Sequence, residues 1–245
     1  ATAITADVST KKAGKTPFKK EDFLKAVQDD AFIEKMVAKY PKLLANLPGK
    51  DSGVRYRLEG YLFPATYNYG KDTTVKEMID QMLAAMDQNL TPYYETLESK
   101  NINVNEVLTL ASLVEKEGAT DQDRKDIASV FYNRLNQDMP LQSNIAILYA
   151  EGKLGQKTTL KEDATIDTEL DSPYNIYKNT GLMPGPVDNP GVSAIEAAVN
   201  PSKTDYLYFV ANVENGEVFF AKTYEEHNKN VEEHVNSKLT QASSN

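Results

Sequence analysis

The chain has 245 residues, of which 40% are hydrophobic and 26% charged, so it is long enough to bury the core of an ordinary globular protein. Its net charge of −9 and pI near 4.9 argue against a nucleic-acid partner, because phosphate binding needs a positive surface. With no cysteine, and with two histidines (His227 and His234) that lack zinc-site spacing, we expect no disulfide, no metal and no cofactor.

The first part of the sequence predicts a polar end followed by a small helical segment. Residues 1–16 are small and polar without periodicity, which is typical of a linker. Thr16 followed by proline predicts a helix start, and an apolar stripe from Phe23 continues to Pro41. We therefore expect residues 17–57 to form a small helical unit that ends in a polar boundary.

An aromatic stretch and a long helix come next. Residues 58–70 are rich in tyrosine and broken by proline and glycine, so they do not predict a helix. They form either an extended segment on the core or a cleft wall, because tyrosine rings suit sugars. Thr74 and Glu77 fit a capping box, and the apolar positions up to Leu90 predict a long amphipathic helix.

The stretch Leu108–Gly118 predicts an apolar helix that runs into two carboxylates. Glu117 continues a fully aliphatic row at positions 110, 113 and 114, whereas Glu115 follows a row that contains a serine. Apolar neighbours desolvate a carboxyl and raise its pKa, as a general acid near neutral pH requires. Gly118 is expected to cap the helix, which places Glu117 at its negative end. The alternative interpretation is a solvated helix terminus.

Two further helices are predicted after this stretch. Thr120 begins one that carries Arg134, which is either a buried partner of a carboxylate or a surface residue with a packed stem. The surface interpretation is favoured. A short helix is expected through Ile145 and Tyr149, and the polar residues 152–172 predict a loop.

Turn-forming residues dominate the segments 172–177 and 181–191. A long irregular segment inside a compact domain is usually a functional loop. Ser193 is expected to cap the helix that follows.

The end of the sequence predicts a β-hairpin and a last helix. Two apolar runs, 206–211 and 218–221, flank Asn215 and Gly216, a pair typical of hairpin turns. A polar helix from Tyr224 closes the chain, and residues 238–245 are expected to be a tail. Many helices with one late antiparallel hairpin predict the α+β class.

Eight stretches together resemble a known family. They are Glu59–Tyr67, Leu110–Glu117, Ala128–Leu135, Leu141–Ser143, Ser172–Tyr177, Gly181–Gly191, Tyr206–Val210 and Glu226–Asn228. In this order they resemble the endolytic murein transglycosylases of the YceG-like (MltG) family over roughly residues 58–235. The combination is specific, although no single stretch is.

The resemblance implies a helix-rich lytic-transglycosylase-type catalytic domain at 58–237, with 17–57 as a remnant of, or adjunct to, a LysM-like module. It implies a lyase that cuts peptidoglycan within glycan strands, between N-acetylmuramic acid and N-acetylglucosamine, and leaves 1,6-anhydro ends. Family members carry one N-terminal membrane helix. The resemblance therefore implies action at the extracytoplasmic face of the plasma membrane. Because no run of 18 apolar residues occurs here, we expect the anchor to be absent from this chain. Peptidoglycan synthases are the protein partners that the family implies.

The family's catalytic glutamate maps to Glu117, the residue that helix geometry also selects. One carboxylate suffices for this reaction, because the C6 hydroxyl of the substrate takes the place of water. The candidates for binding the distorted sugar are polar or aromatic, and each is equally explained by packing: Gln142, Asn144, Tyr149, Tyr174, Asn175, Tyr177 and Tyr67. The chain departs from the family at Asn144, where an acid followed by Pro-Thr is usual, and at Met183, where proline is common.

Two alternatives stay open. A noncatalytic peptidoglycan-binding scaffold would use the aromatic loops to bind glycan and would keep Glu117 as a structural residue. A muramidase that uses water would need a second carboxylate in the cleft. Glu115, Asp171 and Asp188 are candidates for it, with Glu115 disfavoured because it points away from Glu117.

Overall fold

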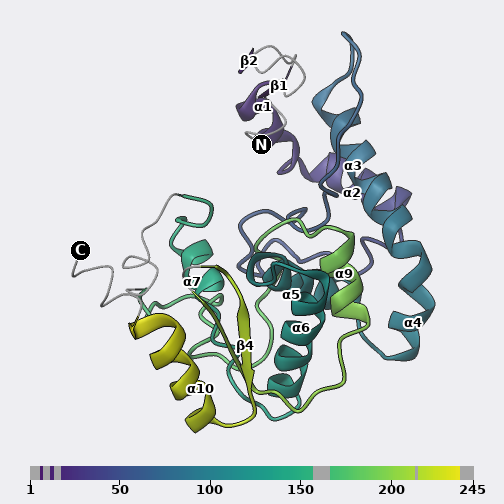
Figure 1. The fold of residues 1–245 in the computed structure, drawn as a ribbon. Coiled ribbons are helices and arrows are strands. Elements are labelled where there is room, and N and C mark those ends of the chain that lie inside the picture. Colours follow the sequence, from purple (N-terminus) through teal and green to yellow (C-terminus); the bar gives the residue numbers. More distant parts are fainter. Residues whose placement is uncertain (1–5, 8–11, 14–17, 157–165, 213–214, 238–245) are drawn as a thin grey trace. The chain divides into compact units, whose positions relative to one another are not determined.

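The computed structural model describes residues 6–7, 12–13, 18–156, 166–212 and 215–237 (Figure 1). The chain divides into two compact units, Ala1–Asn105 and Glu106–Asn245, which are described separately below. The domain limits predicted at residues 17, 58 and 237 stay predictions, and the predicted tail lies outside the described residues.

The first unit begins with short elements. Strands β1 (Ala6–Asp7) and β2 (Lys12–Ala13) pair antiparallel, where the sequence predicted only a polar linker. The apolar stripe predicted from Phe23 is divided between two helices, α1 (Lys20–Ala26) and α2 (Asp30–Lys39). The break arises because Asp29 is extended and caps α2, accepting a 3.2 Å hydrogen bond from the Phe32 amide. The start predicted at Thr16 lies outside the described residues.

The long helix of this unit confirms its predicted cap. In α3 (Val75–Leu90) the Glu77 amide donates to Thr74 Oγ1 at 3.2 Å, and the Thr74 amide donates to Glu77 Oε2 at 2.7 Å. A 3-10 turn (Thr91–Tyr93) and helix α4 (Tyr94–Ser99) follow. Residues 58–70 contain no helix, as predicted.

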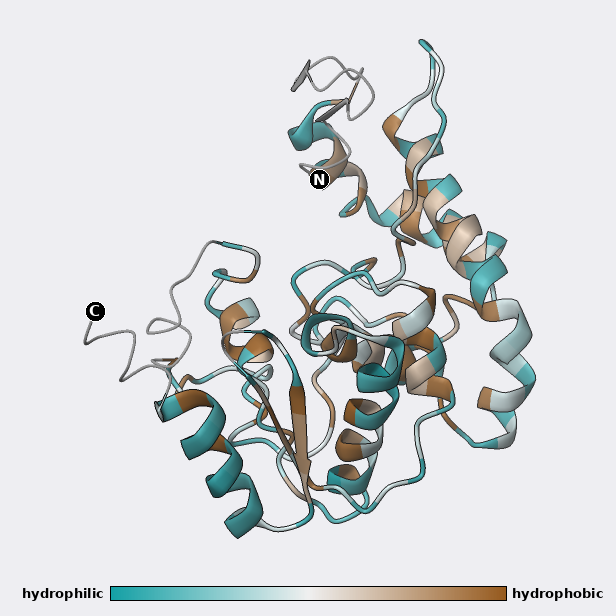
Figure 2. Cartoon of the chain, viewed as in Figure 1, coloured by the Kyte–Doolittle hydropathy of each residue, from teal (hydrophilic) through white to brown (hydrophobic). Residues whose placement is uncertain are grey.

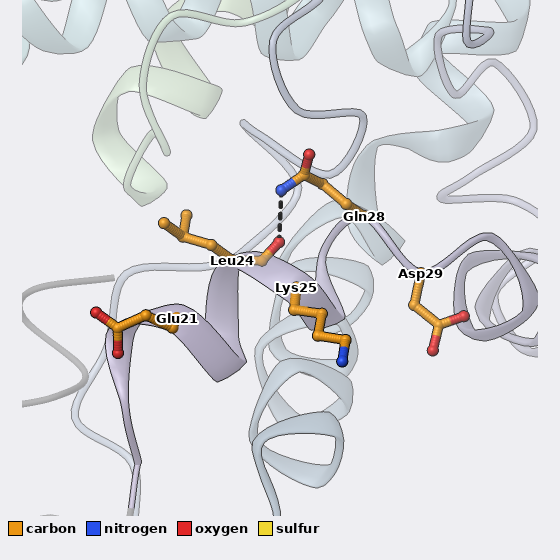
Figure 3. Close-up of a pocket in the computed structure, with 5 residues that line it drawn as sticks. All are labelled: Glu21, Leu24, Lys25, Gln28 and Asp29. Carbon is orange, nitrogen blue, oxygen red and sulfur yellow. Dashed lines mark hydrogen bonds between the residues drawn. The ribbon is translucent and has the colours of Figure 1, made fainter.

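A surface depression of about 580 Å³ lies along α1 in this unit (Figure 3). Its lining residues are Glu21, Leu24, Lys25, Gln28 and Asp29. The Gln28 side-chain amide donates to the Leu24 carbonyl at 2.8 Å. None of the predicted site residues lines this depression, so it is not the candidate active site.

The second unit is built on buried helices. Its elements are α5 (Val104–Glu117, which begins two residues before the unit boundary), α6 (Asp121–Leu135), α7 (Asn144–Ala150), α9 (Val192–Val199), α10 (Tyr224–Val231) and a π turn (Glu232–Asn236). Along α5, Leu108, Leu110, Leu113 and Val114 are at most 1% exposed. Burying each such side chain stabilises the fold by about 1.5–3 kcal/mol. Helix α6 packs against α9 (Figure 1).

The predicted hairpin is confirmed. Strands β3 (Tyr208–Ala211) and β4 (Val218–Ala221) pair antiparallel, with Tyr208 opposite Ala221. Gly216 adopts φ +75°, the left-handed conformation that such a turn requires. The hairpin contacts both α6 and α10, and Figure 2 shows that α10 is largely hydrophilic while β4 is hydrophobic. Helices with one small antiparallel hairpin late in the chain confirm the α+β class.

One predicted helix end needs correction. Helix α9 is preceded by Gly191 as N-cap, so Ser193 lies within the first turn and donates instead to Asp121 Oδ1. Helix α5 ends at Glu117 with Gly118 directly after it, as predicted. A Cβ at Gly118 would lie 2.6 Å from Arg124 Cγ and 3.0 Å from the Arg124 amide nitrogen, so close approach of α6 is what requires glycine there.

Within the described residues, no helix combines the length and the hydropathy that crossing a bilayer requires.

Candidate active site

The last turn of α5 places Glu117 at the edge of the core of the second unit. Its helical neighbours Leu113 and Val114 are fully buried, and Leu110 is 1% exposed. The Gly118 amide donates to the Val114 carbonyl at 3.0 Å and closes the helix. Glu117 itself is half-buried, so the carboxyl is crowded by protein atoms although part of the residue meets solvent. Burial raises the pKa of this carboxyl above its usual value, as the aliphatic row predicted.

A single side chain donates to this carboxyl among the described residues. Ser143 precedes α7, is 3% exposed, and its hydroxyl donates to Glu117 Oε1 at 2.7 Å. The Ile145 amide donates to Ser143 Oγ at 3.3 Å, so the serine also caps α7 and its own proton is directed to Glu117. The Ser143 bond lowers the Glu117 pKa, but burial has the larger effect. Sequence reasoning did not select Ser143, although it ends the Leu-Gln-Ser motif.

The residues around Ser143 contact the turn-rich segment 172–177. The backbone amide of Gln142 donates to the Ile176 carbonyl at 3.0 Å. The Tyr177 hydroxyl donates to Asn144 Oδ1. Burial and the nearby charge of Glu117 raise the pKa of Tyr177 to about 12, so its phenol stays a hydrogen-bond donor at neutral pH. The structure therefore brings Glu117, Asn144 and Tyr177 together, and Gln142 lies exposed beside them.

Three other predicted binding residues are buried. Asn175 is 0% exposed, and its side-chain amide donates to the carbonyls of Thr168 at 2.9 Å and Leu170 at 2.8 Å. The rings of Tyr149 and Tyr174, 5% and 3% exposed, lie 4.8 Å apart. Their binding role stays a prediction, but such burial favours support of the loop over contact with a glycan.

Tyr67 belongs to the first unit. Its hydroxyl donates to the Phe63 carbonyl at 2.6 Å, and burial raises the pKa of Tyr67 to about 12. Its role in substrate binding stays a prediction.

Arg134 is buried, so the favoured surface interpretation was wrong. Its side chain is held by carbonyl oxygens: Nε donates to Leu207 at 2.6 Å, and Nη1 donates to Pro140 at 3.1 Å and to Leu141 at 2.9 Å. No carboxylate pairs with it among the described residues. The burial of Arg134 was hard to predict because its acceptors are backbone carbonyls, which leave no pattern of side-chain types in the sequence.

The opposite side of α5 holds the segment 181–191. The buried Ser112 hydroxyl accepts a 3.0 Å bond from the Val187 amide, and Glu115 Oε2 accepts a 3.0 Å bond from the Gly191 amide. Lys116 pairs with Asp188 at 3.0 Å. Two of the three acids considered as a second catalytic carboxylate, Glu115 and Asp188, are thus engaged in holding this segment.

The third acid, Asp171, is exposed. Among the residues that the structure describes, no group of three or more His, Cys, Asp or Glu side chains is arranged to hold a metal ion. The arrangement around Glu117 is therefore one desolvated carboxyl with a hydroxyl donor, beside polar side chains from residues 142–144 and 177. Such a carboxyl can give and then take back a proton without a second acid.

Residues 3–233 match the model of the YceG-like family. The endolytic murein transglycosylase of Streptococcus pneumoniae serotype 2 (strain D39) is 67% identical over 219 residues, which are 89% of this chain and 40% of that protein. The endolytic murein transglycosylase of Bacillus subtilis (strain 168) is 43% identical over 227 residues, 92% of this chain and 61% of that protein. The chain therefore spans about two fifths to three fifths of the length of these curated relatives.

A solved structure is also similar. The crystal structure of a yceG-like protein from Listeria monocytogenes aligns with a TM-score of 0.76 and 46% identity, over 86% of this chain and 67% of that one. The two proteins are therefore similar in sequence as well as in fold. The family match, the curated relatives and this structure confirm the resemblance seen in the sequence motifs, and the chain belongs to the YceG-like family.

Proposed function

We propose that this chain carries the catalytic part of an endolytic murein transglycosylase, a lyase that cuts peptidoglycan strands internally and leaves 1,6-anhydro ends on N-acetylmuramic acid. Family membership and the names of the curated relatives support this function. The observation that carries it is the half-buried Glu117, a carboxyl with raised pKa and one hydroxyl donor, placed where part of the residue meets solvent.

In this proposal Glu117 acts first as an acid. Its proton goes to the glycosidic oxygen as the bond from that oxygen to C1 of N-acetylmuramic acid breaks. The carboxylate then accepts the proton of the C6 hydroxyl of the same sugar while that oxygen bonds to C1. The proton returns to Glu117 and no water is consumed, so the products sum to the substrate. Proton transfer of this kind contributes about 10²–10⁴ in rate.

The two contacts of Glu117 suit both halves of this cycle. Burial favours the protonated acid that begins the reaction, and the Ser143 hydroxyl stabilises the carboxylate that forms in the middle of it. A pKa balanced by these opposing effects is what one residue needs to serve as both acid and base.

The sugar at the cleavage point is expected to meet Gln142, Asn144 and Tyr177, which keep partial or full exposure beside Glu117. We assign Tyr149, Tyr174 and Asn175 to support of this surface. Tyr67 is retained as a candidate from the first unit. Distortion of the sugar and stabilisation of positive charge at C1 would supply the remaining acceleration.

The place of action and the partners are part of the same proposal. A peptidoglycan substrate supports action at the extracytoplasmic face of the plasma membrane, where an N-terminal membrane helix of the whole protein would hold it. Peptidoglycan synthases, which make the strands that such an enzyme cuts, are the expected protein partners. Release of shorter strands at the wild-type rate from cells that carry the Glu117→Gln variant would argue against Glu117 as the acid in cells.

The test compares two acids of one helix. Purified peptidoglycan strands are treated with the wild type, Glu117→Gln and Glu115→Gln, and the products are weighed by mass spectrometry. We expect anhydro ends from the wild type and from Glu115→Gln, whose amide oxygen can still accept the Gly191 bond. Glu117→Gln should lose about 10²–10⁴ in rate, because an amide cannot transfer the proton.

The products separate this proposal from its rivals. Reducing ends would indicate a muramidase that uses water, because hydrolysis adds one water to the cut end. Glycan binding by the wild type without any turnover would indicate a scaffold. Full activity in Glu117→Gln would contradict the mechanism itself.

A further inference from the structure

Arg134 connects three separate parts of the second unit. It lies on α6, where its Nε donates to the Leu207 carbonyl just before β3 at 2.6 Å. Its Nη1 donates to two carbonyls of the segment before α7, those of Pro140 and Leu141, and approaches Gln142 Oε1 at 3.3 Å. The guanidinium also lies 5.0 Å from the ring centre of Tyr208. At 7% exposure, the arginine is an internal brace between the hairpin and residues 140–142.

The segment that Arg134 holds is strained. Gln142 adopts φ +55°, a left-handed conformation that a residue with a side chain rarely takes. Such a conformation is unfavourable for a residue with a side chain and persists only where the surroundings fix it. Here the backbone amide of Gln142 is bound to the Ile176 carbonyl. The carbonyl of the preceding residue, Leu141, and the side-chain oxygen of Gln142 are bound to Arg134. The next residue along the chain is Ser143, the donor to Glu117.

We propose that Arg134 is a positioning residue of the candidate active site: by fixing the strained segment 140–142, it sets the Ser143 hydroxyl against Glu117. Arg134 has no hydrogen bond to Glu117 among the described residues, so its effect on Glu117 passes through the segment 140–142 and Ser143. The effect of Arg134 on turnover rests on the proposed function. Its effect on the ionisation of Glu117 does not, because that can be measured without substrate.

The side-chain chemistry explains why an arginine suits this position. A guanidinium is planar and presents donors in a fixed fork, so Nε can bind the hairpin while Nη1 binds the segment before α7. A lysine keeps the charge but offers one ammonium group, which cannot occupy both positions. Arg134→Lys therefore removes the brace while it preserves charge and most of the volume.

The same helix offers a matched control. The Asn133 side-chain amide donates to the carbonyls of Thr204 at 2.8 Å and Tyr206 at 2.9 Å, so it too binds the chain that leads into β3. Unlike Arg134, the Asn133 side chain makes no hydrogen bond to residues 140–143 within the described part of the chain. Asn133→Ala should lower the free energy of unfolding, because these two hydrogen bonds are lost, and should leave the Glu117 pKa unchanged.

The experiment titrates Glu117 by carbon-13 NMR in protein labelled at glutamate, with the signal assigned by its loss in Glu117→Gln. We expect the Glu117 pKa to rise in Ser143→Ala, because the hydroxyl that favours the carboxylate is gone. Arg134→Lys should raise it in the same direction, and the double variant should show no further rise. In parallel, kcat should fall about two- to tenfold in Arg134→Lys, and the pH profile should move with the pKa.

The outcomes decide the inference directly. A folded Arg134→Lys protein with the wild-type Glu117 pKa would overturn it, as would an equal shift in Asn133→Ala. If Arg134→Lys does not fold, Arg134→Gln decides instead, because its shorter side chain cannot bind both the hairpin and the segment before α7. A rise of the Glu117 pKa in that variant supports the inference, and no change overturns it. If Glu117→Gln were fully active, the proposed function would fail while this titration would still give its answer.

Discussion

The two sides of the last turns of α5 are built for different tasks. On one side, Ser112 and Glu115 each accept a backbone amide of the segment 181–191, at 3.0 Å in both cases. On the other side, Glu117 receives a single side-chain hydroxyl and is desolvated by aliphatic neighbours. Two glutamates separated by one lysine thus have different partners because the helix directs them to different faces.

The comparison shows what makes an acid available for chemistry. A carboxylate that accepts an amide from a loop is committed to holding that loop. A carboxyl that has one hydroxyl partner and is packed against apolar side chains can change its protonation state without releasing a loop. In the proposed mechanism, loop anchoring by Glu115 and proton transfer by Glu117 are therefore separated within one turn of helix.

The largest effect is expected on the anchoring side. Ser112→Ala removes a fully buried acceptor and leaves the Val187 amide without this bond, so the free energy of unfolding should fall by about 1–3 kcal/mol. Urea unfolding measures the loss. Ser193→Ala, which removes a partly exposed hydroxyl, is the matched control and should cost less. An equal loss of stability in both variants would contradict the prediction that the buried Ser112 hydroxyl is the stronger anchor.

A second prediction concerns stability on the Glu117 side. Because the folded pKa is raised above the unfolded value, the native state holds more protons than the unfolded state between those two values. The free energy of unfolding of the wild type should therefore fall as pH rises from 4.5 through the folded pKa. Glu117→Gln lacks this loss, so its stability relative to the wild type should increase over the same range.

Chemical denaturation of both proteins at a series of pH values measures this difference. Below 4.5 the carboxyl is protonated in both states of the wild type and the difference should be constant. A difference that is flat across the whole series would mean that burial does not raise the Glu117 pKa.

The smallest effect is expected for the ion pair between Lys116 and Asp188. Both side chains are 34% exposed and their charged atoms lie 3.0 Å apart. Pairs that reach solvent typically couple by about 0.2–1 kcal/mol. A double-mutant cycle with Lys116→Met and Asp188→Asn should give a coupling in this range that weakens with salt. A coupling well above it would make this pair, and not the amide bonds, the main anchor of the segment 181–191.

Local patterns were sufficient to predict much of the fold. The capping box at Thr74, the helix start at Thr120 and the turn at Gly216 depend on residues within a few positions, so the sequence displays them directly. The environment of Glu117 was predictable for the same reason, because a helix brings positions 110, 113 and 114 onto one face with it.

Contacts between distant segments were not predictable in this way. Arg134 meets backbone carbonyls, which every residue possesses, so no partner could be read from side-chain types. Gly118 was expected as a helix cap, but its close contact with Arg124 of the next helix was not predicted. The Ser143 contact with Glu117 joins residues 26 positions apart, and only the fold brings them together.

The central claim is that burial raises the pKa of the Glu117 carboxyl above its ordinary value, which suits it to act as the acid. The most direct test is a carbon-13 NMR titration of Glu117 in the wild-type protein. The account predicts a midpoint above the ordinary value of 4.5. A midpoint at or below 4.5 would show an ordinary carboxylate at neutral pH and would contradict the assignment of Glu117 as the acid.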